Sequence, residues 1–167
     1  ISSFEDIKDQ NELEDALIFD QRSLKNPYYD ANERWGQIDA DGLRYSLVDF
    51  YHRYHKPLFI VENGIGIDET MKDGKVYDDE RISYYQKHIQ AINTAVEHDG
   101  VDLMGYLAWS PIDFLSSHKE IRKRYGFVYV DRDFEDLKEL KRYPKKSFYW
   151  YKKVIESQGK DLENDID

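Results

Sequence analysis

The 167-residue sequence contains no cysteine, no long apolar run and no excess of basic residues. Without cysteine, disulfides and thiolate metal sites are excluded, and a reducing compartment fits. No apolar run approaches the roughly 20 residues that cross a bilayer, so we expect no membrane partner. The formal net charge of −10 argues against a nucleic-acid partner, because nucleic-acid phosphates bind basic surfaces. An anionic small molecule would require a local cluster of positive charge.

Neither end of the chain shows the pattern of a regular element. Ile1 is followed by acidic and polar residues, so we expect no signal peptide. A start without Met indicates that the chain begins inside a longer gene product. Residues 1–25 are charged and lack a sustained period, apart from a short helix expected over 12–19, and are predicted to be rich in loops. The tail 159–167 is acidic and is expected to fray.

The composition fits one globular core, with 40% hydrophobic and 15% aromatic residues. The aromatic residues include 14 tyrosines. Aromatic side chains suit either a well-filled core or a sugar site, where their flat apolar faces stack on sugar rings. Core packing is the favoured interpretation for most of them.

Three helices are predicted between these ends. The first opens at Asp39 and Asp41, and Pro57 stops it. Acidic residues at 78–80 open the second, Gly100 closes it, and Pro144 opens the third. The apolar stripes that define these helices are Leu43, Leu47, Phe50 and Tyr54, then Ile82, Tyr85, Ile89, Ile92 and Val96, then Phe148, Tyr151 and Ile155.

Two apolar runs, 58–61 and 101–109, indicate buried strands, and residues 126–131 indicate a further strand. The central order is helix, buried strand, helix, buried strand, helix, which is typical of parallel βαβ units. Two parallel strands are too few for a sheet, and a closed (β/α)8 TIM barrel needs eight strands and ~250 residues. The predicted fold class is therefore α/β, the C-terminal part of a barrel whose beginning is absent.

Glu62 is the first candidate for chemistry. It directly follows the run 58–61 and so lies at the carboxyl end of a strand, where α/β barrel enzymes build their active sites. Asn63 and Gly64, which come next, are also an ordinary turn signal. The tripeptide alone therefore fits a simple turn as well as an active site.

A second constellation follows the next strand. Trp109 ends that strand and reaches the same face as Glu62, either as core or as a platform under a sugar ring. The segment 117–125 then carries Lys119, Arg122, Lys123 and Arg124 against one Glu120. In an acidic chain this segment is either a solvated basic loop or the cation cluster that an anionic ligand requires.

Four motifs in this order resemble glycoside hydrolase family 1. Residues 58–64 (Leu-Phe-Ile-Val-Glu-Asn-Gly) resemble the strand that ends in the family's nucleophile, and Trp109-Ser110 with Asp113 resembles its final strand. Residues 125–131 resemble the hairpin that follows, and 143–147 the motif that opens the last helix.

The resemblance covers about residues 26–158, while the segment 35–40 departs from the family pattern in its displaced Trp and in Ala40, which stands for a usual Pro. It implies about strands 7 and 8 of the barrel, with flanking helices and a hairpin. Residues 1–158 would then be the C-terminal part of a single glycoside hydrolase domain.

The same resemblance implies a retaining glycosidase with Glu62 as its nucleophile and no metal or organic cofactor. Such enzymes use two carboxyl groups about 5 Å apart. The family's acid/base is the Glu of an Asn-Glu-Pro motif, and neither Asn11-Glu12-Leu13 nor Asn32-Glu33-Arg34 contains the proline. We find no acid/base in this chain and expect it to be inactive by itself.

One position sorts the family by substrate. Members that act on plain glucosides carry a Glu seven residues after the strand-8 Trp, and this chain carries Ser116 there. A carboxylate would repel a sugar phosphate, whereas a hydroxyl can donate to it. Lys123 and Tyr125 match the Lys-x-Tyr pattern of the phospho-glycosidase branch and add charge and a second hydroxyl. Ser117 favours 6-phospho-glucosides, although the short spacing from Ser116 to Lys123 resembles the loop of phospho-galactosidases.

Three functions stay open. The first is hydrolysis of 6-phospho-β-glucosides to glucose 6-phosphate and an aglycone. The second is a noncatalytic product, either an inactive fragment or one chain of a split enzyme whose partner is the missing N-terminal part of the barrel. The third is a sugar-phosphate-binding module, which would have no need of Glu62. Unpaired strand edges would favour association, homo-oligomers included. The resemblance, with the absent signal peptide and cysteines, implies a bacterial cytoplasm.

Overall fold

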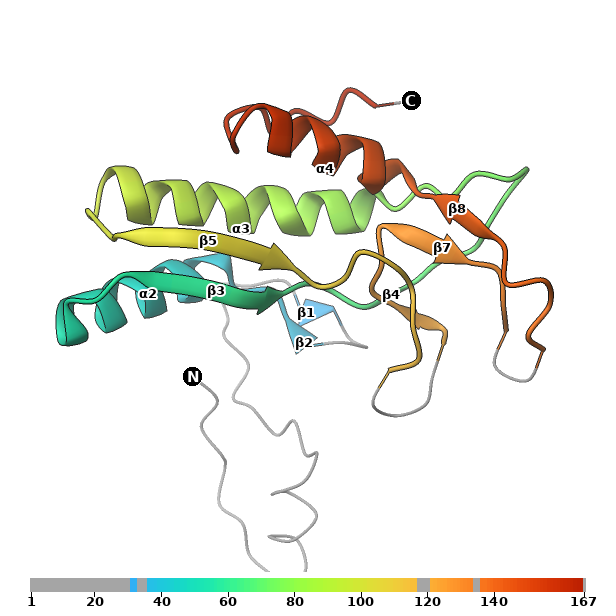
Figure 1. The fold of residues 1–167 in the computed structure, drawn as a ribbon, viewed down its shortest axis with the longest axis horizontal. Helices are drawn as coiled ribbons and strands as arrows, with labels where there is room; N and C mark the ends of the chain where they lie inside the picture. The colour runs from blue at the N-terminus through green and yellow to red at the C-terminus, as the bar shows by residue number, and fades with distance from the viewer. Residues whose placement is uncertain (1–30, 33–35, 117–120, 134–135, 167) are drawn as a thin grey trace, which may run out of the picture.

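A computed structural model describes residues 31–32, 36–116, 121–133 and 136–166. The helix predicted over residues 12–19 lies outside these ranges. Along the described chain, the first two helices each follow a pair of strands, and the last helix follows a run of four strands (Figure 1). No helix in this part of the chain is long and apolar enough to cross a membrane.

The centre of the fold is a βαβ unit. Strands β3 (Leu58–Asn63) and β5 (Leu103–Ala108) pair in parallel, and α3 (Asp79–Glu97) lies alongside them (Figure 1). The predicted parallel pairing is confirmed. Because the strands are parallel, their carboxyl ends meet at one edge of the sheet, where Asn63 is paired with Ala108.

Helix α2 (Ala40–Tyr54) begins and ends where its sequence signals place it. The side chain of Asp39 accepts a hydrogen bond from the backbone N–H of Gly42 at 2.6 Å, which caps the first turn. His55 follows the helix in the left-handed conformation, with φ of 51°, two residues before Pro57. The predicted boundaries are therefore confirmed.

The apolar stripes predicted for α2 and α3 are only partly buried. Leu47 of α2 is buried, but Phe50 and Tyr54 are exposed, because α3 covers a face of α2 that includes Val48 and Tyr51 instead. On α3, Val96 is also exposed. The two buried clusters are Ile82, Tyr85, Ile89, Phe127, Trp150 and Val154, and Leu47, Ile92, Ala95 and Val101.

The two strands that the sequence analysis expected to be buried are open on one face, which is a correction. Phe59 is 44% exposed, Val61 71% and Leu107 53%. Helices cover the opposite face, on which Ile60 and Tyr106 pack. The side chains on the open face belong to neither buried cluster of the described residues.

Short antiparallel pairs surround this unit. They are β1 (Ala31–Asn32) with β2 (Gly36–Gln37), β4 (Ile67–Asp68) with β6 (Lys123–Arg124), and β7 (Val128–Val130) with β8 (Arg142–Pro144). The last pair is the expected hairpin. Its first strand is shorter than the predicted 126–131.

Helix α4 (Lys146–Glu156) starts two residues after Pro144, the expected first residue. Pro144 instead ends β8, where it pairs with Val128. The acidic tail does not fray: the Leu162 carbonyl accepts hydrogen bonds from Gln86 at 2.6 Å and from Trp150 at 3.3 Å. Side-chain contacts to buried neighbours therefore override the polar composition of the tail.

Candidate active site

Four of the predicted site residues line one cleft of about 490 Å³ at the carboxyl ends of β3 and β5: Glu62, Trp109, Ser116 and Tyr125. The other lining residues are Asn63, Gly64 and Phe114. The lining residues come from the end of β3 and from the segment after β5, which are far apart in sequence. Their meeting follows from the parallel pairing of the two strands.

Glu62 is exposed to solvent, and its neighbour Asn63 is held firmly. The Asn63 amide donates to the Tyr84 hydroxyl at 3.1 Å and accepts from the Tyr106 hydroxyl at 2.8 Å. Burial raises the pKa of both tyrosines, so their hydroxyls stay protonated. The backbone N–H of Trp109 also donates to the Asn63 carbonyl at 2.7 Å, which ties the two strand ends together.

Trp109 is half-exposed, and its ring meets that of Phe114 edge to face with centroids 5.0 Å apart. The peptide bond between Trp109 and Ser110 is cis. The Tyr85 hydroxyl donates to the Trp109 carbonyl at 3.1 Å. The hydrogen bond from α3 therefore holds the backbone of Trp109 in place, and Trp109 lines the cleft.

The far wall of the cleft carries the residues predicted to bind phosphate. Ser116 is buried and Tyr125 is half-buried. The Phe114 ring stacks on Tyr125 at 5.5 Å, and the Lys123 Nζ atom lies 5.5 Å from the centroid of the Tyr125 ring. Lys123 is thus beside the cleft rather than among its lining residues. Ser117 lies outside the described residues.

The predicted cation cluster is smaller than the sequence indicated. Arg124 is buried, donates to Asp113 at 3.0 Å and to the Val130 carbonyl at 2.9 Å, and stacks 3.9 Å from the centroid of the Tyr129 ring. It therefore serves the fold and does not face a ligand, because alternation along β6 turns it away from Lys123. Lys119 lies outside the described residues.

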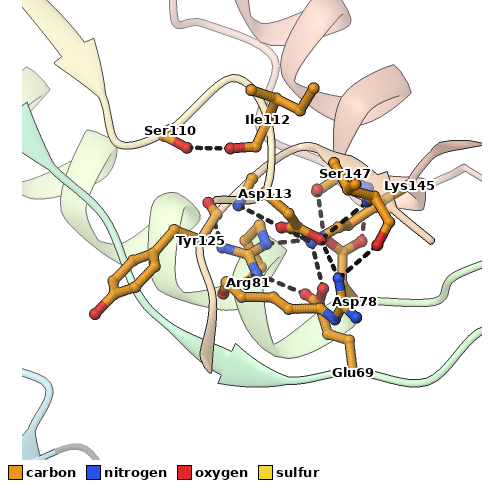
Figure 2. A network of polar contacts seen from close by, with 12 residues as sticks. Glu69, Asp78, Arg81, Ser110, Ile112, Asp113, Tyr125, Lys145 and Ser147 are labelled. Atoms are coloured by element: carbon orange, nitrogen blue, oxygen red, sulfur yellow. Dashed lines mark hydrogen bonds and ion pairs between the residues drawn. The ribbon is translucent and has the colours of Figure 1, made fainter. Parts of the chain in front are cut away.

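A buried network of ion pairs, which the sequence analysis missed, supports the wall of the cleft that carries Ser116 and Tyr125 (Figure 2). Arg81 of α3 donates to Asp78 at 2.9 Å and to Glu69 at 2.6 Å. It also donates to the backbone carbonyls of Ile65, Arg124 and Tyr125 at 2.7, 2.8 and 2.9 Å. One guanidinium thereby joins the loop after β3 to the strand that carries Lys123.

Lys145 and Asp113 extend the network toward α4. Lys145 donates to Asp113 at 2.9 Å and contacts Glu69, and Asp113 also accepts from the Gly126 N–H at 2.9 Å. Burial lowers the pKa of Lys145 and raises the pKa of Glu69, because both charges are removed from water. Only the i, i+3 spacing of Asp78 and Arg81 was visible in sequence; the other partners are brought together by the fold.

Glu62 is the single carboxylate among the described residues that line the cleft. Glu12 and Glu33, of the two Asn-Glu sequences, lie outside the described residues. In the described part of the chain, no group of His, Asp and Glu is arranged to hold a metal ion. The described lining of the cleft therefore presents one carboxylate, the aromatic rings of Trp109 and Phe114, and the hydroxyls of Ser116 and Tyr125.

Comparisons with known proteins identify the family of this chain. The model of the family described as glycosyl hydrolase family 1 matches residues 3–160. The aryl-phospho-β-D-glucosidase BglA of Bacillus subtilis (strain 168) is 53% identical over 142 residues, covering 83% of this chain and 29% of that protein. The 6-phospho-β-glucosidase AscB of Escherichia coli (strain K12) is 52% identical over 145 residues, covering 85% of this chain and 30% of that protein.

A solved family 1 β-glucosidase from Thermotoga maritima, in complex with isofagomine lactam, has a similar structure. It superposes with a TM-score of 0.72 at 31% identity, over 83% of this chain and 30% of that chain. The present chain thus spans roughly 30% of the length of the relatives it matches. With the family match extending over residues 3–160, the chain belongs to glycosyl hydrolase family 1 and forms a part of that family's TIM barrel.

Proposed function

We propose that this chain supplies the nucleophile and the phosphate-binding side chains of a retaining 6-phospho-β-glucosidase. The cleft is the observation that carries the proposal, because Glu62, Trp109, Ser116 and Tyr125 line it together. The relatives add support, since two of those most similar are an aryl-phospho-β-D-glucosidase and a 6-phospho-β-glucosidase.

The proposed chemistry has two steps. The Glu62 carboxylate attacks the anomeric carbon, and the bond to the aglycone oxygen breaks as that oxygen takes a proton. Water then attacks the anomeric carbon of the glycosyl ester and gives a proton to the group that had protonated the aglycone oxygen, which releases glucose 6-phosphate and restores the carboxylate. Exposure of Glu62 to the cleft leaves it accessible to a sugar, and Trp109 offers the apolar face on which the ring can rest.

The proton for the aglycone must come from a second carboxyl group about 5 Å from the nucleophile. No second carboxylate lines the cleft among the described residues. We therefore assign the acid/base to the remaining part of a family 1 barrel, which is the partner that this chain requires. The same reasoning predicts that the chain alone turns over no substrate.

Binding of the sugar phosphate is assigned to Ser116, Lys123 and Tyr125, which together are called the phosphate end of the site. Two hydroxyls and one ammonium suit a dianion, because hydrogen bonds to charged oxygens are stronger than those between neutral groups. Ser117 is assigned to the same end, as the residue that favours glucose over galactose configuration. A bacterial cytoplasm, where phosphorylated sugars accumulate, is the proposed setting.

A noncatalytic role as one chain of a split enzyme is the second candidate, and the open face of the sheet favours it. A groove of about 870 Å³ runs between this face and α4, and its lining includes the exposed residues Val61, Leu107, Phe148 and Ile155. Exposed apolar surface of this kind marks an interaction site. The remaining barrel is the proposed occupant, and self-association through the same face is the competing outcome.

Hydrolysis of p-nitrophenyl β-glucoside, with and without a 6-phosphate, tests the proposal. The proteins compared are this chain alone and a version extended upstream to a whole barrel, called the extended protein below. We expect that only the extended protein cleaves, and that it strongly prefers the phosphorylated compound. Equal cleavage of both compounds would contradict the assigned phosphate end, and turnover by the short chain would show that it contains an acid/base of its own.

A further inference from the structure

We propose that Gly66 is a specificity-determining residue, whose missing side chain leaves the space in which Lys123 and Tyr125 take their places beside the cleft. This inference rests on the proposed function and deepens it. Gly66 lies four residues after Glu62, in the segment between β3 and β4, and is buried.

The space around Gly66 is filled by the two side chains assigned to phosphate. A Cβ atom at this position would lie 2.5 Å from Cγ and 2.7 Å from Cε of Lys123, and 2.9 Å from Cε1 of Tyr125. Carbon atoms in ordinary contact are about 3.5–4.0 Å apart. Any residue other than glycine would therefore push Lys123 or Tyr125 away from its present position.

The obstacle at Gly66 consists of side chains, not of backbone. At Gly64 and Gly126, by contrast, an added Cβ would meet the Trp109 carbonyl oxygen at 1.9 Å and the Asp113 nitrogen at 2.2 Å. The backbone of Gly66 is not in the left-handed region, so alanine would meet no strain from φ. Replacement of Gly66 should thus displace the phosphate-binding groups with little change in the path of the chain.

Two further contacts limit where these groups can go. The pairing of β4 with β6 sets Asp68 opposite Lys123, which fixes the backbone of Lys123 relative to the segment that follows the nucleophile. The Phe114 ring stacks on Tyr125 at 5.5 Å. With its backbone held in this way, Lys123 can respond to a larger residue 66 chiefly by moving its ammonium group.

The test measures KM and kcat of the extended protein for p-nitrophenyl β-glucoside with and without the 6-phosphate. In Gly66→Ala we expect KM for the phosphorylated compound to rise about tenfold or more, the size of one lost charge-assisted hydrogen bond. kcat/KM for the unphosphorylated compound should stay within about twofold. Gly105→Ala is the matched control: its Cβ would crowd the Phe59 ring at 2.7 Å, outside the cleft, and should not discriminate between the compounds.

A double variant separates the proposed contact from general damage. If Gly66→Ala acts by displacing Lys123, it should add little to the loss in Lys123→Ala, because the two changes remove the same interaction. If Gly66→Ala alone fails to fold, the double variant that combines it with Lys123→Ala must fold, because it lacks Cγ and Cε of Lys123, the two atoms closest to the added Cβ. Equal losses on both compounds, or an unfolded double variant, would overturn the inference.

The outcomes also distinguish this inference from the function on which it rests. A wild-type extended protein that does not prefer the phosphorylated compound would overturn both. A wild type with that preference, and a Gly66→Ala variant that keeps it unchanged, would overturn the role of Gly66 alone.

Discussion

Glu62 owes its position to its neighbours more than to contacts of its own. Asn63 is bonded on both sides of its amide, at 3.1 Å to Tyr84 and at 2.8 Å to Tyr106. Because burial raises the pKa of these tyrosines, their hydroxyls stay neutral and the bonds persist through the pH range in which a carboxylate nucleophile works. An exposed carboxylate whose neighbouring residue is anchored suits the proposed role of Glu62 as nucleophile.

A charge introduced at position 116 provides a test at this scale. In the extended protein, Ser116→Glu should lower kcat/KM for the phosphorylated compound about tenfold or more, because two like charges roughly 4 Å apart repel by several kcal/mol. Ser116→Gln introduces a side chain of nearly the same shape as glutamate but without the charge. Its kcat/KM for the phosphorylated compound should fall much less. Equal losses in the two variants would mean that crowding at a buried position, not charge, explains the effect.

At the scale of elements, the buried ion pairs join segments that are far apart in the sequence. Arg81 extends from α3 to the carbonyls before β4 and within and after β6, while Lys145, just before α4, reaches Asp113 in the segment after β5. The wall of the cleft is thus built on elements whose relative positions depend on these charges. Such a network is costly to break, because each partner is left as an unpaired charge away from water.

Arg81→Met should therefore destabilise the protein by about 3–5 kcal/mol, because Glu69 and Asp78 would lose their common partner. Urea unfolding followed by circular dichroism measures the loss. The control is Arg53→Met, which removes an exposed pair with Asp49 at 3.0 Å and should have a much smaller effect, since solvent screens that pair. Equal effects would indicate that the buried network contributes no more than a surface ion pair.

At the scale of the whole molecule, the sequence predicted the order of elements well and the burial of their faces less well. Capping residues such as Asp39 and the turn at Gly100 act locally, so the limits of α2 and α3 follow from nearby residues. The faces of β3 depend on what packs against them, and the described chain leaves Val61 71% exposed. An apolar run predicts that a strand is covered in the complete barrel. It does not predict that the residues of this chain provide the cover.

The site residues also divide into those whose positions follow from the nearby sequence and those whose positions depend on the fold. The meeting of Glu62 and Trp109 in one cleft was predictable because each lies at the carboxyl end of a strand, and parallel pairing brings these ends together. The buried position of Arg124 was not predicted, because a basic residue that binds a buried carboxylate looks the same in sequence as one that binds a ligand or lies in solvent. The network around Arg81 could not be predicted, since its acceptors include three backbone carbonyls from two distant segments.

Covalent labelling of Glu62 tests the proposed function most directly. A 2-deoxy-2-fluoro-β-glucosyl fluoride traps a glycosyl ester on a retaining nucleophile, and its fluoride leaves without a proton, so labelling does not depend on the acid/base. We expect the 6-phosphorylated form to label the extended protein at Glu62 and to do so faster than the unphosphorylated form, as peptide mass spectrometry would show. A label on any other residue would contradict the assigned nucleophile, and equal labelling rates for the two forms would contradict the assigned phosphate site.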